Sequence, residues 1–115
     1  MIKLKNLEIT EVEKDDLIIF RLNGSIHTEI YTEFLAYLKE KINKKNVIMD
    51  FLHLTYMSST GTGVLFNLNK IIRDQGGKFI LFGLNESIQH VINLTKLNTS
   101  FIIVANEEEA LQKIQ

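Results

Sequence analysis

The second half of the chain alternates short apolar runs with amphipathic segments, and this alternation restricts the fold more than any other feature. The apolar runs cover residues 47–51, 78–82 and 99–104. Between and after them, apolar residues recur every three or four positions, which indicates helices that lie on a sheet by one face. Strands that alternate with helices form a mainly parallel sheet, because a right-handed crossover returns each strand to the same sheet.

The first 42 residues add a hairpin and one helix. Residues 7–12 alternate apolar and polar side chains, as a strand with one buried face does, whereas residues 17–22 are more uniformly apolar. The charged residues at 13–16 predict the turn between them, so we expect 7–12 to form an antiparallel edge strand. Helical spacing then extends from about residue 28 to 42, with Thr28 as the expected cap.

These patterns together predict an α/β fold. We expect one domain over residues 1–115, with a mainly parallel sheet of about five strands, an antiparallel edge strand and about four helices. A chain of 115 residues can bury a sufficient core without disulfides or metals.

Composition narrows the possible functions. The chain has no cysteine, which excludes disulfides, thiolate catalysis and cysteine-ligated zinc. A net charge of -1 gives no general attraction for nucleic acid or an anionic membrane, so neither is expected as a partner. The chain has neither the apolar region of a signal peptide nor a run long enough to span a membrane, so we expect a cytoplasmic protein without membrane insertion.

No set of residues has the spacing of a catalytic or metal site. His27, His53 and His90 are scattered, and each is more typical of a surface or loop position than of a metal ligand. Asp50 suggests a receiver-type phosphoaspartate, but no acidic cluster accompanies it to hold magnesium. The segment 61–63, Gly-Thr-Gly, lacks the lysine of a phosphate-binding loop and the third glycine of a dinucleotide fingerprint. We therefore expect a protein that is not an enzyme and has no catalytic residues, metal or cofactor.

Two clusters of like charge are explained by helix electrostatics. Lys41, Lys44 and Lys45 lie at the end of the first expected helix, where positive charge complements the helix dipole. We interpret them as a solvated face and not as a phosphate-binding patch. Three glutamates at 107–109 follow Asn106, an expected helix cap, and suit the positive end of the last helix.

A segment of hydroxyl and glycine residues at 58–63 joins an apolar strand to an amphipathic helix. A helix beginning near Thr60 places the three hydroxyl side chains of 58–60 beside its free backbone N–H groups. There an oxygen can cap the helix, and a phosphate is tolerated. On residue types alone, the site is a structural cap, a phosphoacceptor or both. We expect the preceding Tyr56 and Met57 to pack at the strand end.

The sequence around this segment resembles the STAS domain family of anti-sigma factor antagonists. Residues 50–65 run from a strand aspartate through apolar residues to Ser-Ser-Thr-Gly and then Thr-Gly-Val-Leu, which is similar to the signature of that family. Residues 21–26 resemble the exit of its second strand, and residues 75–79 the end of the following helix. The order and length of the expected elements agree with the family throughout the chain.

The resemblance implies a binding switch. In this family, the hydroxyl residue just before the first glycine is phosphorylated by a partner that is both an anti-sigma factor and a serine/threonine kinase. That position is Thr60, with Ser59 as the alternative acceptor and the expected helix cap. The unphosphorylated domain would bind the kinase and free a sigma factor, and a phosphatase would reverse the modification. The residues expected to contact the partner are Ser58, Ser59, Thr60, Gly61, Thr62 and Gly63.

The sequence departs from the family pattern at three positions. Ser58 replaces the usual aspartate, Thr62 replaces an aliphatic residue that could touch the partner, and His27 stands where the family often has aspartate. The alternative function is a non-switching STAS subunit of a larger assembly, such as a stressosome-like scaffold or a lipid-transport complex.

Overall fold

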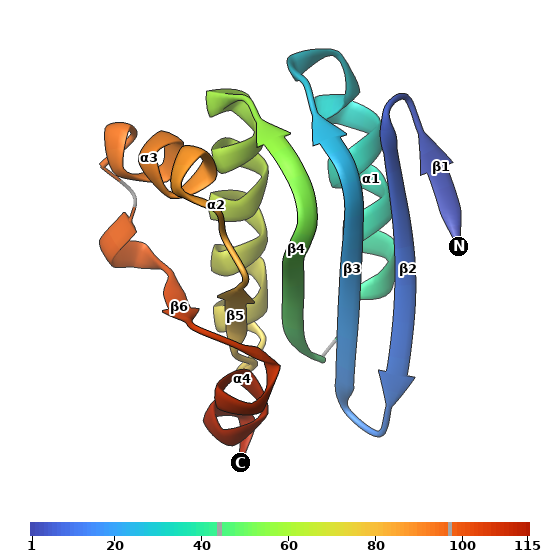
Figure 1. Ribbon diagram of the computed structural model, residues 1–115. Helices are drawn as coiled ribbons and strands as arrows, with labels where there is room; N and C mark the ends of the chain where they lie inside the picture. The colour runs from blue at the N-terminus through green and yellow to red at the C-terminus, as the bar shows by residue number, and fades with distance from the viewer. Residues whose placement is uncertain (44, 97) are drawn as a thin grey trace.

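The computed structural model describes residues 1–43, 45–96 and 98–115. In this part of the chain, six strands form one sheet in the order β1-β2-β3-β4-β5-β6 (Figure 1). The strands are β1 (Ile2–Leu4), β2 (Leu7–Lys14), β3 (Leu17–Ile26), β4 (Asn46–Met57), β5 (Phe79–Phe82) and β6 (Ile102–Val104). The helices are α1 (Tyr31–Lys41), α2 (Ser59–Asp74), α3 (Glu86–Leu94) and α4 (Glu107–Ile114), with 3-10 turns η1 (Thr28–Ile30) and η2 (Asn98–Ser100). Strands β3 to β6 pair in parallel and β1 to β3 pair antiparallel, which confirms the predicted fold class.

The N-terminal residues form a strand that was not predicted from the sequence. Strand β1 pairs with β2, with Ile2 opposite Ile9 and Leu4 opposite Leu7. Asn6 permits the tight turn between them because it adopts a left-handed φ of 64°. The prediction that residues 7–12 form the edge of the sheet is therefore wrong, since β1 lies outside them.

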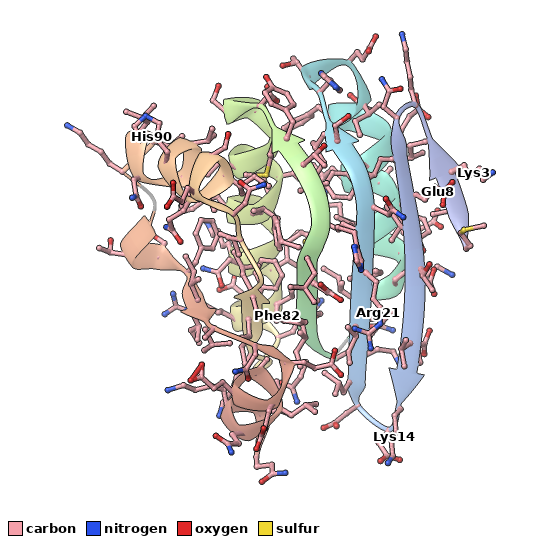
Figure 2. All side chains as sticks on the ribbon, in the orientation of Figure 1. Lys3, Glu8, Lys14, Arg21, Phe82 and His90 are labelled. Atoms are coloured by element: carbon pink, nitrogen blue, oxygen red, sulfur yellow. The ribbon has the colours of Figure 1, made fainter. Side chains whose placement is uncertain are left out.

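The helices cover the two faces of the sheet unequally. In Figure 1, α1 and α2 lie behind the sheet, and α4 crosses in front of its lower end. The larger core lies behind the sheet and contains Phe20, Phe34, Phe51 and Phe79. A smaller cluster on the α4 side consists of Ile19, Ile48, Ile80, Phe82 and Ala110, and Figure 2 labels Phe82 within it. In the first part of β4, Val47 and Met49 belong to the larger core and Ile48 to the smaller cluster, which explains the unbroken apolar run there.

The ends of the last elements differ slightly from their expected positions. Strand β6 is shorter than the predicted run 99–104, because the residues before it form η2. Helix α2 ends at Asp74 and is followed by Gly76, whose φ of 82° provides the left-handed geometry expected at the end of this helix. Asn106 caps α4 as predicted, since its side chain accepts a hydrogen bond from the backbone N–H of Glu109.

Candidate functional site

Two adjacent parallel strands bring the hydroxyl-rich segment to one edge of the sheet. Strands β3 and β4 end side by side, with Ile26 opposite Met57. The backbone N–H of Ser58 donates to the carbonyl of Ile26 at 2.9 Å, so the pairing continues to the first residue beyond β4. Helix α2 begins immediately afterwards. The carboxyl ends of parallel strands are where α/β folds place their binding sites.

Three hydroxyl groups meet at this edge and define what we call the hydroxyl cluster: Thr28, Ser58 and Thr60. The Thr60 Oγ1 lies 2.6 Å from the Thr28 Oγ1 and 3.1 Å from the Ser58 Oγ. The Thr28 Oγ1 also lies 3.4 Å from the Ser58 Oγ. Each pair is close enough for a hydrogen bond, and the hydrogen atoms can rotate to suit a new acceptor.

Thr28 is the member of the cluster whose predicted role was different. It was expected to cap the first helix, but α1 begins at Tyr31, and neither η1 nor α1 has a side-chain cap. That prediction is wrong, because the Thr28 hydroxyl bonds to Thr60 instead. The two residues are 32 positions apart, so only the pairing of β3 with β4 brings them together.

The cap of α2 also differs from the prediction. Ser58, with extended dihedral angles, occupies the N-cap position that was expected for Ser59, and no side-chain oxygen caps the helix. The carbonyl of Ser58 accepts the N–H of Gly61 at 2.9 Å, while the Ser58 hydroxyl bonds within the hydroxyl cluster. The first turn of α2 therefore has no side-chain cap, and its positive end can receive an anion.

The rest of the expected partner-binding segment is partly inside the protein. Gly61 is buried, and a Cβ there would lie 2.5 Å from the Met57 Cγ, so glycine allows α2 to approach β4 closely. Thr62 is fully buried, and its Oγ1 is the buried side-chain atom without a hydrogen-bond partner among the described residues. A partner docking here would therefore touch Ser58, Ser59, Thr60 and the half-buried Gly63, but not the Thr62 side chain.

An aromatic pair lies at the ends of the same two strands. The rings of His27 and Tyr56 are tilted by 32° with centroids 4.9 Å apart, and the Ser25 hydroxyl lies 3.0 Å from the His27 Nε2. Tyr56 therefore packs against His27 at the strand end, in agreement with the prediction, although it remains 43% exposed. The same interpretation is confirmed for Met57, which is buried. The exposed surface near the hydroxyl cluster thus includes an aromatic side chain.

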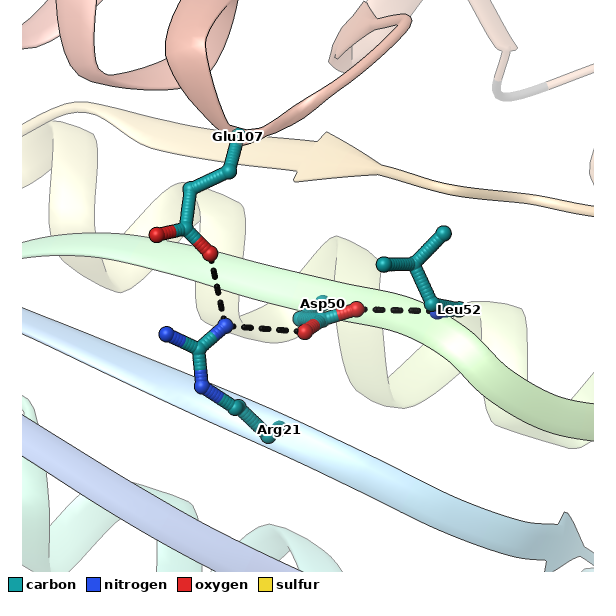
Figure 3. Close-up of polar contacts among 4 residues, drawn as sticks. All are labelled: Arg21, Asp50, Leu52 and Glu107. Carbon is teal, nitrogen blue, oxygen red and sulfur yellow. Dashed lines mark hydrogen bonds and ion pairs between the residues drawn. The ribbon is translucent and has the colours of Figure 1, made fainter.

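A second polar network lies on the α4 side of the sheet, where Arg21 bridges two carboxylates (Figure 3). Its Nη1 donates to the Asp50 Oδ2 at 2.9 Å and to the Glu107 Oε1 at 2.6 Å. The other Asp50 oxygen accepts the N–H of Leu52 at 2.9 Å. The hydrogen bond to Glu107 and that to Asp50 outweigh desolvation and raise the pKa of Arg21.

This network has two consequences for the predicted roles of its members. Asp50 is nearly buried in the middle of β4 and bound to Arg21, so it is not a free phosphoaspartate of the receiver type. Glu107 does suit the positive end of α4, but it also ties that helix to β3. The dipole interpretation of Glu107 was therefore correct but incomplete.

The basic residues near the end of α1 are paired with acidic residues of β2. Lys41 lies 3.7 Å from Glu11, and Lys45 lies 3.1 Å from Glu13. These ion pairs agree with the interpretation of a solvated face. Lys44, the third lysine of that cluster, lies outside the described residues.

Tyr37 links α1 to the same strand. Its hydroxyl donates to the Glu11 carboxylate, and its ring packs edge-on against Phe20. Burial, followed by the hydrogen bond to Glu11, raises the pKa of Tyr37 well above its ordinary value.

The remaining histidines lie apart from the hydroxyl cluster. His53 and His90 are exposed, and Figure 2 labels His90 on α3. Among the residues that the structure describes, no three His, Cys, Asp or Glu side chains are grouped to hold a metal ion. No helix in the same ranges has both the length and the apolar character of a membrane span.

The fold and the hydroxyl cluster define a class of small α/β modules with a hydroxyl-bearing turn between a central strand and a helix. The sequence model of the STAS domain family matches residues 8–110, and the chain belongs to this family. The family resemblance is therefore confirmed.

Known proteins extend this likeness over almost the whole chain. The anti-sigma F factor antagonist of Paenibacillus polymyxa is 23% identical over 113 residues, which cover 96% of this chain and 97% of that protein. An anti-sigma factor antagonist from Mycobacterium paratuberculosis has the same fold, with a TM-score of 0.83, 14% identity and coverage of 94% and 93%. The Bacillus cell fate determinant SpoIIAA in its phosphorylated form matches with a TM-score of 0.66, 18% identity and coverage of 95% and 99%.

Proposed function

We propose that this chain is an anti-sigma factor antagonist whose binding to its partner is switched by phosphorylation of Thr60. The observation that carries the proposal is the position of the Thr60 hydroxyl, which lies within the hydroxyl cluster at the uncapped start of α2. Relatives named as anti-sigma factor antagonists support the class of partner. The partner in this proposal is an anti-sigma factor that is also a serine/threonine kinase, and a phosphatase resets the switch.

The surroundings of Thr60 suit a phosphoryl group. After transfer, the Thr60 Oγ1 has lost its proton and can only accept hydrogen bonds. Thr28 and Ser58 can each rotate their hydroxyl hydrogens to donate to the ester or to the phosphoryl oxygens. The positive end of α2 adds a favourable electrostatic contribution of about 0.3–1 kcal/mol at an exposed site. The modified domain can therefore remain folded.

The same phosphoryl group opposes binding to a partner. It adds about -1.5 to -2 charges at neutral pH to a surface that must lose water in a complex. A like charge on the partner at ~4 Å costs about 4 kcal/mol per unit pair at an effective dielectric constant of ~20. The chain needs no catalytic activity of its own, because the kinase transfers the phosphoryl group and the phosphatase removes it.

Phosphate mapping tests the site. The wild-type chain, Thr60→Ala and Ser59→Ala are each incubated with the anti-sigma kinase and ATP, and the modified residue is identified by mass spectrometry. We expect modification of the wild type and of Ser59→Ala, and loss of it in Thr60→Ala. Ser59→Ala is the matched control because Ser59 is exposed beside Thr60. Undiminished phosphorylation of Thr60→Ala would refute the assignment of the acceptor.

Binding measurements test the switch separately. We expect Thr60→Glu to bind the unmodified kinase at least tenfold more weakly than Thr60→Gln, since the two side chains have the same shape and differ in charge. Equal affinity of the two variants for the kinase would instead favour a non-switching subunit of a larger assembly. If neither variant nor the wild type binds the kinase, an anti-sigma kinase is excluded as the partner.

A further inference from the structure

A groove runs along the C-terminal half of α2, at the opposite end of the helix from Thr60. It consists of two adjoining hollows of about 480 and 310 Å³ that share Asn69, Arg73 and Ser100 as lining residues. Cavities of about 300–1,000 Å³ are typical of sites for small molecules. We call this feature the α2 groove. Arg73 lies 13 positions after Thr60 on the same helix, so the Arg73 end of the groove is about 20 Å from Thr60.

Positive charge is concentrated in the α2 groove although the whole chain has a net charge of -1. Lys70, Arg73 and Lys78 line it, and Asp74 is the carboxylate among the lining residues. The Lys70 ammonium and the Arg73 guanidinium form no hydrogen bond or ion pair with another residue that the structure describes. Two unpaired cations at the rim of a concave surface attract anions more strongly than isolated surface lysines do.

A nearly buried amide fixes a polar group inside the groove. Asn69 is 5% exposed, and its Nδ2 donates to the carbonyl of Ser100 at 2.8 Å. Because only the nitrogen can donate to a carbonyl, this bond fixes the orientation of the amide. The Asn69 Oδ1 has no hydrogen-bond partner in the described part of the chain. It can therefore accept a hydrogen bond from a hydroxyl group in the groove.

Aromatic side chains provide an apolar wall. Phe66 is 40% exposed along the outer hollow, and Phe79 and Phe101 line the inner one. An exposed phenylalanine beside unpaired cations suits a ligand that has both an anionic head and an apolar ring.

The end of α2 does not expose a strong negative dipole to such a ligand. The carbonyls of Ile71, Ile72 and Arg73 accept hydrogen bonds from the backbone N–H groups of residues 75–77. Carbonyls engaged in this way contribute less to the negative charge of the helix terminus.

We propose that the α2 groove binds a small phosphate monoester with an apolar ring. Arg73 presents a planar fork of N–H donors that matches the oxygens of a phosphate, and Lys70 adds a second positive charge. The Asn69 Oδ1 accepts from a protonated phosphate oxygen or from a hydroxyl of the organic part, and the ring lies against Phe66. This site is separate from Thr60 and does not depend on the proposed switch.

A titration of the full chain tests the proposal. Inorganic phosphate and phenyl phosphate are added in turn to isotopically labelled protein, and amide chemical shifts are followed by NMR. We expect shift changes concentrated at residues 66–74 and 99–102, with phenyl phosphate binding about 2- to 10-fold more tightly because of its ring. Arg73→Gln is expected to weaken phenyl phosphate binding about tenfold or more, since it removes hydrogen bonds between charged groups.

A matched variant separates specific binding from general charge. Lys39→Gln removes one positive charge from an exposed position on α1, outside the groove, and we expect it to leave phenyl phosphate binding unchanged. Arg73 is itself exposed, so Arg73→Gln is expected to fold. The dispersion of the amide chemical shifts in its NMR spectrum tests this expectation. Equal binding by Arg73→Gln and wild type, or shifts of equal size around Lys39, would overturn the proposal. Binding only to an acidic segment of a protein partner would also overturn it.

Discussion

Thr62 has a hydroxyl group that is fully buried without a hydrogen-bond partner in the described chain, and Thr62→Val replaces that hydroxyl with a methyl group of similar size. An unsatisfied buried hydroxyl costs about 1–3 kcal/mol of folding free energy. Both side chains are β-branched and restricted at χ1. We therefore expect Thr62→Val to raise the free energy of unfolding by about 1–3 kcal/mol. For a chain of this size that corresponds to a melting temperature higher by about 4 to 12 °C.

Chemical denaturation with a fluorescence or circular dichroism readout measures the effect. The matched control is Thr32→Val, which makes the same chemical change at an exposed position near the start of α1 and is expected to alter stability by less than about 0.5 kcal/mol. Because the Thr62 side chain does not reach the surface, phosphorylation at Thr60 should proceed as in the wild type. A Thr62→Val variant that is less stable than the wild type would show that the hydroxyl has a partner and would refute this reasoning.

Three further predictions concern the packing of α2 and the polar links between elements. Gly61→Ala is expected to cost about 1–3 kcal/mol in denaturation experiments, because its Cβ would contact the end of β4, whereas Gly63→Ala has room and should be neutral or slightly stabilising. Arg21→Met should lower the free energy of unfolding by about 3 kcal/mol, since it leaves a nearly buried carboxylate unpaired; Glu107→Gln, at a half-exposed ion pair, should cost less than about 1 kcal/mol. The raised pKa of Tyr37 means that the folded state holds this proton more tightly than the unfolded state, so stability is retained below about pH 10 and falls as the pH rises further. Tyr37→Phe should flatten that alkaline decline, and an unchanged slope would contradict the assignment.

The sequence predicted the elements whose periodicity is strong. The apolar runs of β4 and β5 and the amphipathic faces of α2 and α3 were recognised because each buries a regular set of side chains. Strand β1 was missed because three residues are too few to show a period, and its stability depends on pairing with β2. The start of β6 was also predicted too early in the sequence, because the 3-10 turn before it has no distinctive apolar pattern.

The candidate site was predicted less completely, because its contacts join distant parts of the chain. The hydroxyl segment after β4 was visible as a strand followed by serines, threonines and glycines. The bond from Thr60 to Thr28 spans 32 residues, and that from Arg21 to Glu107 spans 86. Local spacing contains no information on such pairs, which follow from strand register and from the crossing of α4 over the sheet.

The packing of α2 explains how a modification of Thr60 can act on a partner without rearranging the domain. Gly61 lies against the end of β4 so closely that a methyl group would collide, and Val64, Leu65, Leu68 and Ile72 continue the buried side of the helix. Because the interior is closely packed along the whole buried side of α2, even a small shift of this helix against the sheet is unfavourable. The Thr60 hydroxyl, in contrast, bonds to two flexible hydroxyl groups that can change partners locally. The proposed switch therefore works by a change of charge on a rigid surface, and the modified chain should keep the same fold while its affinity for the partner falls.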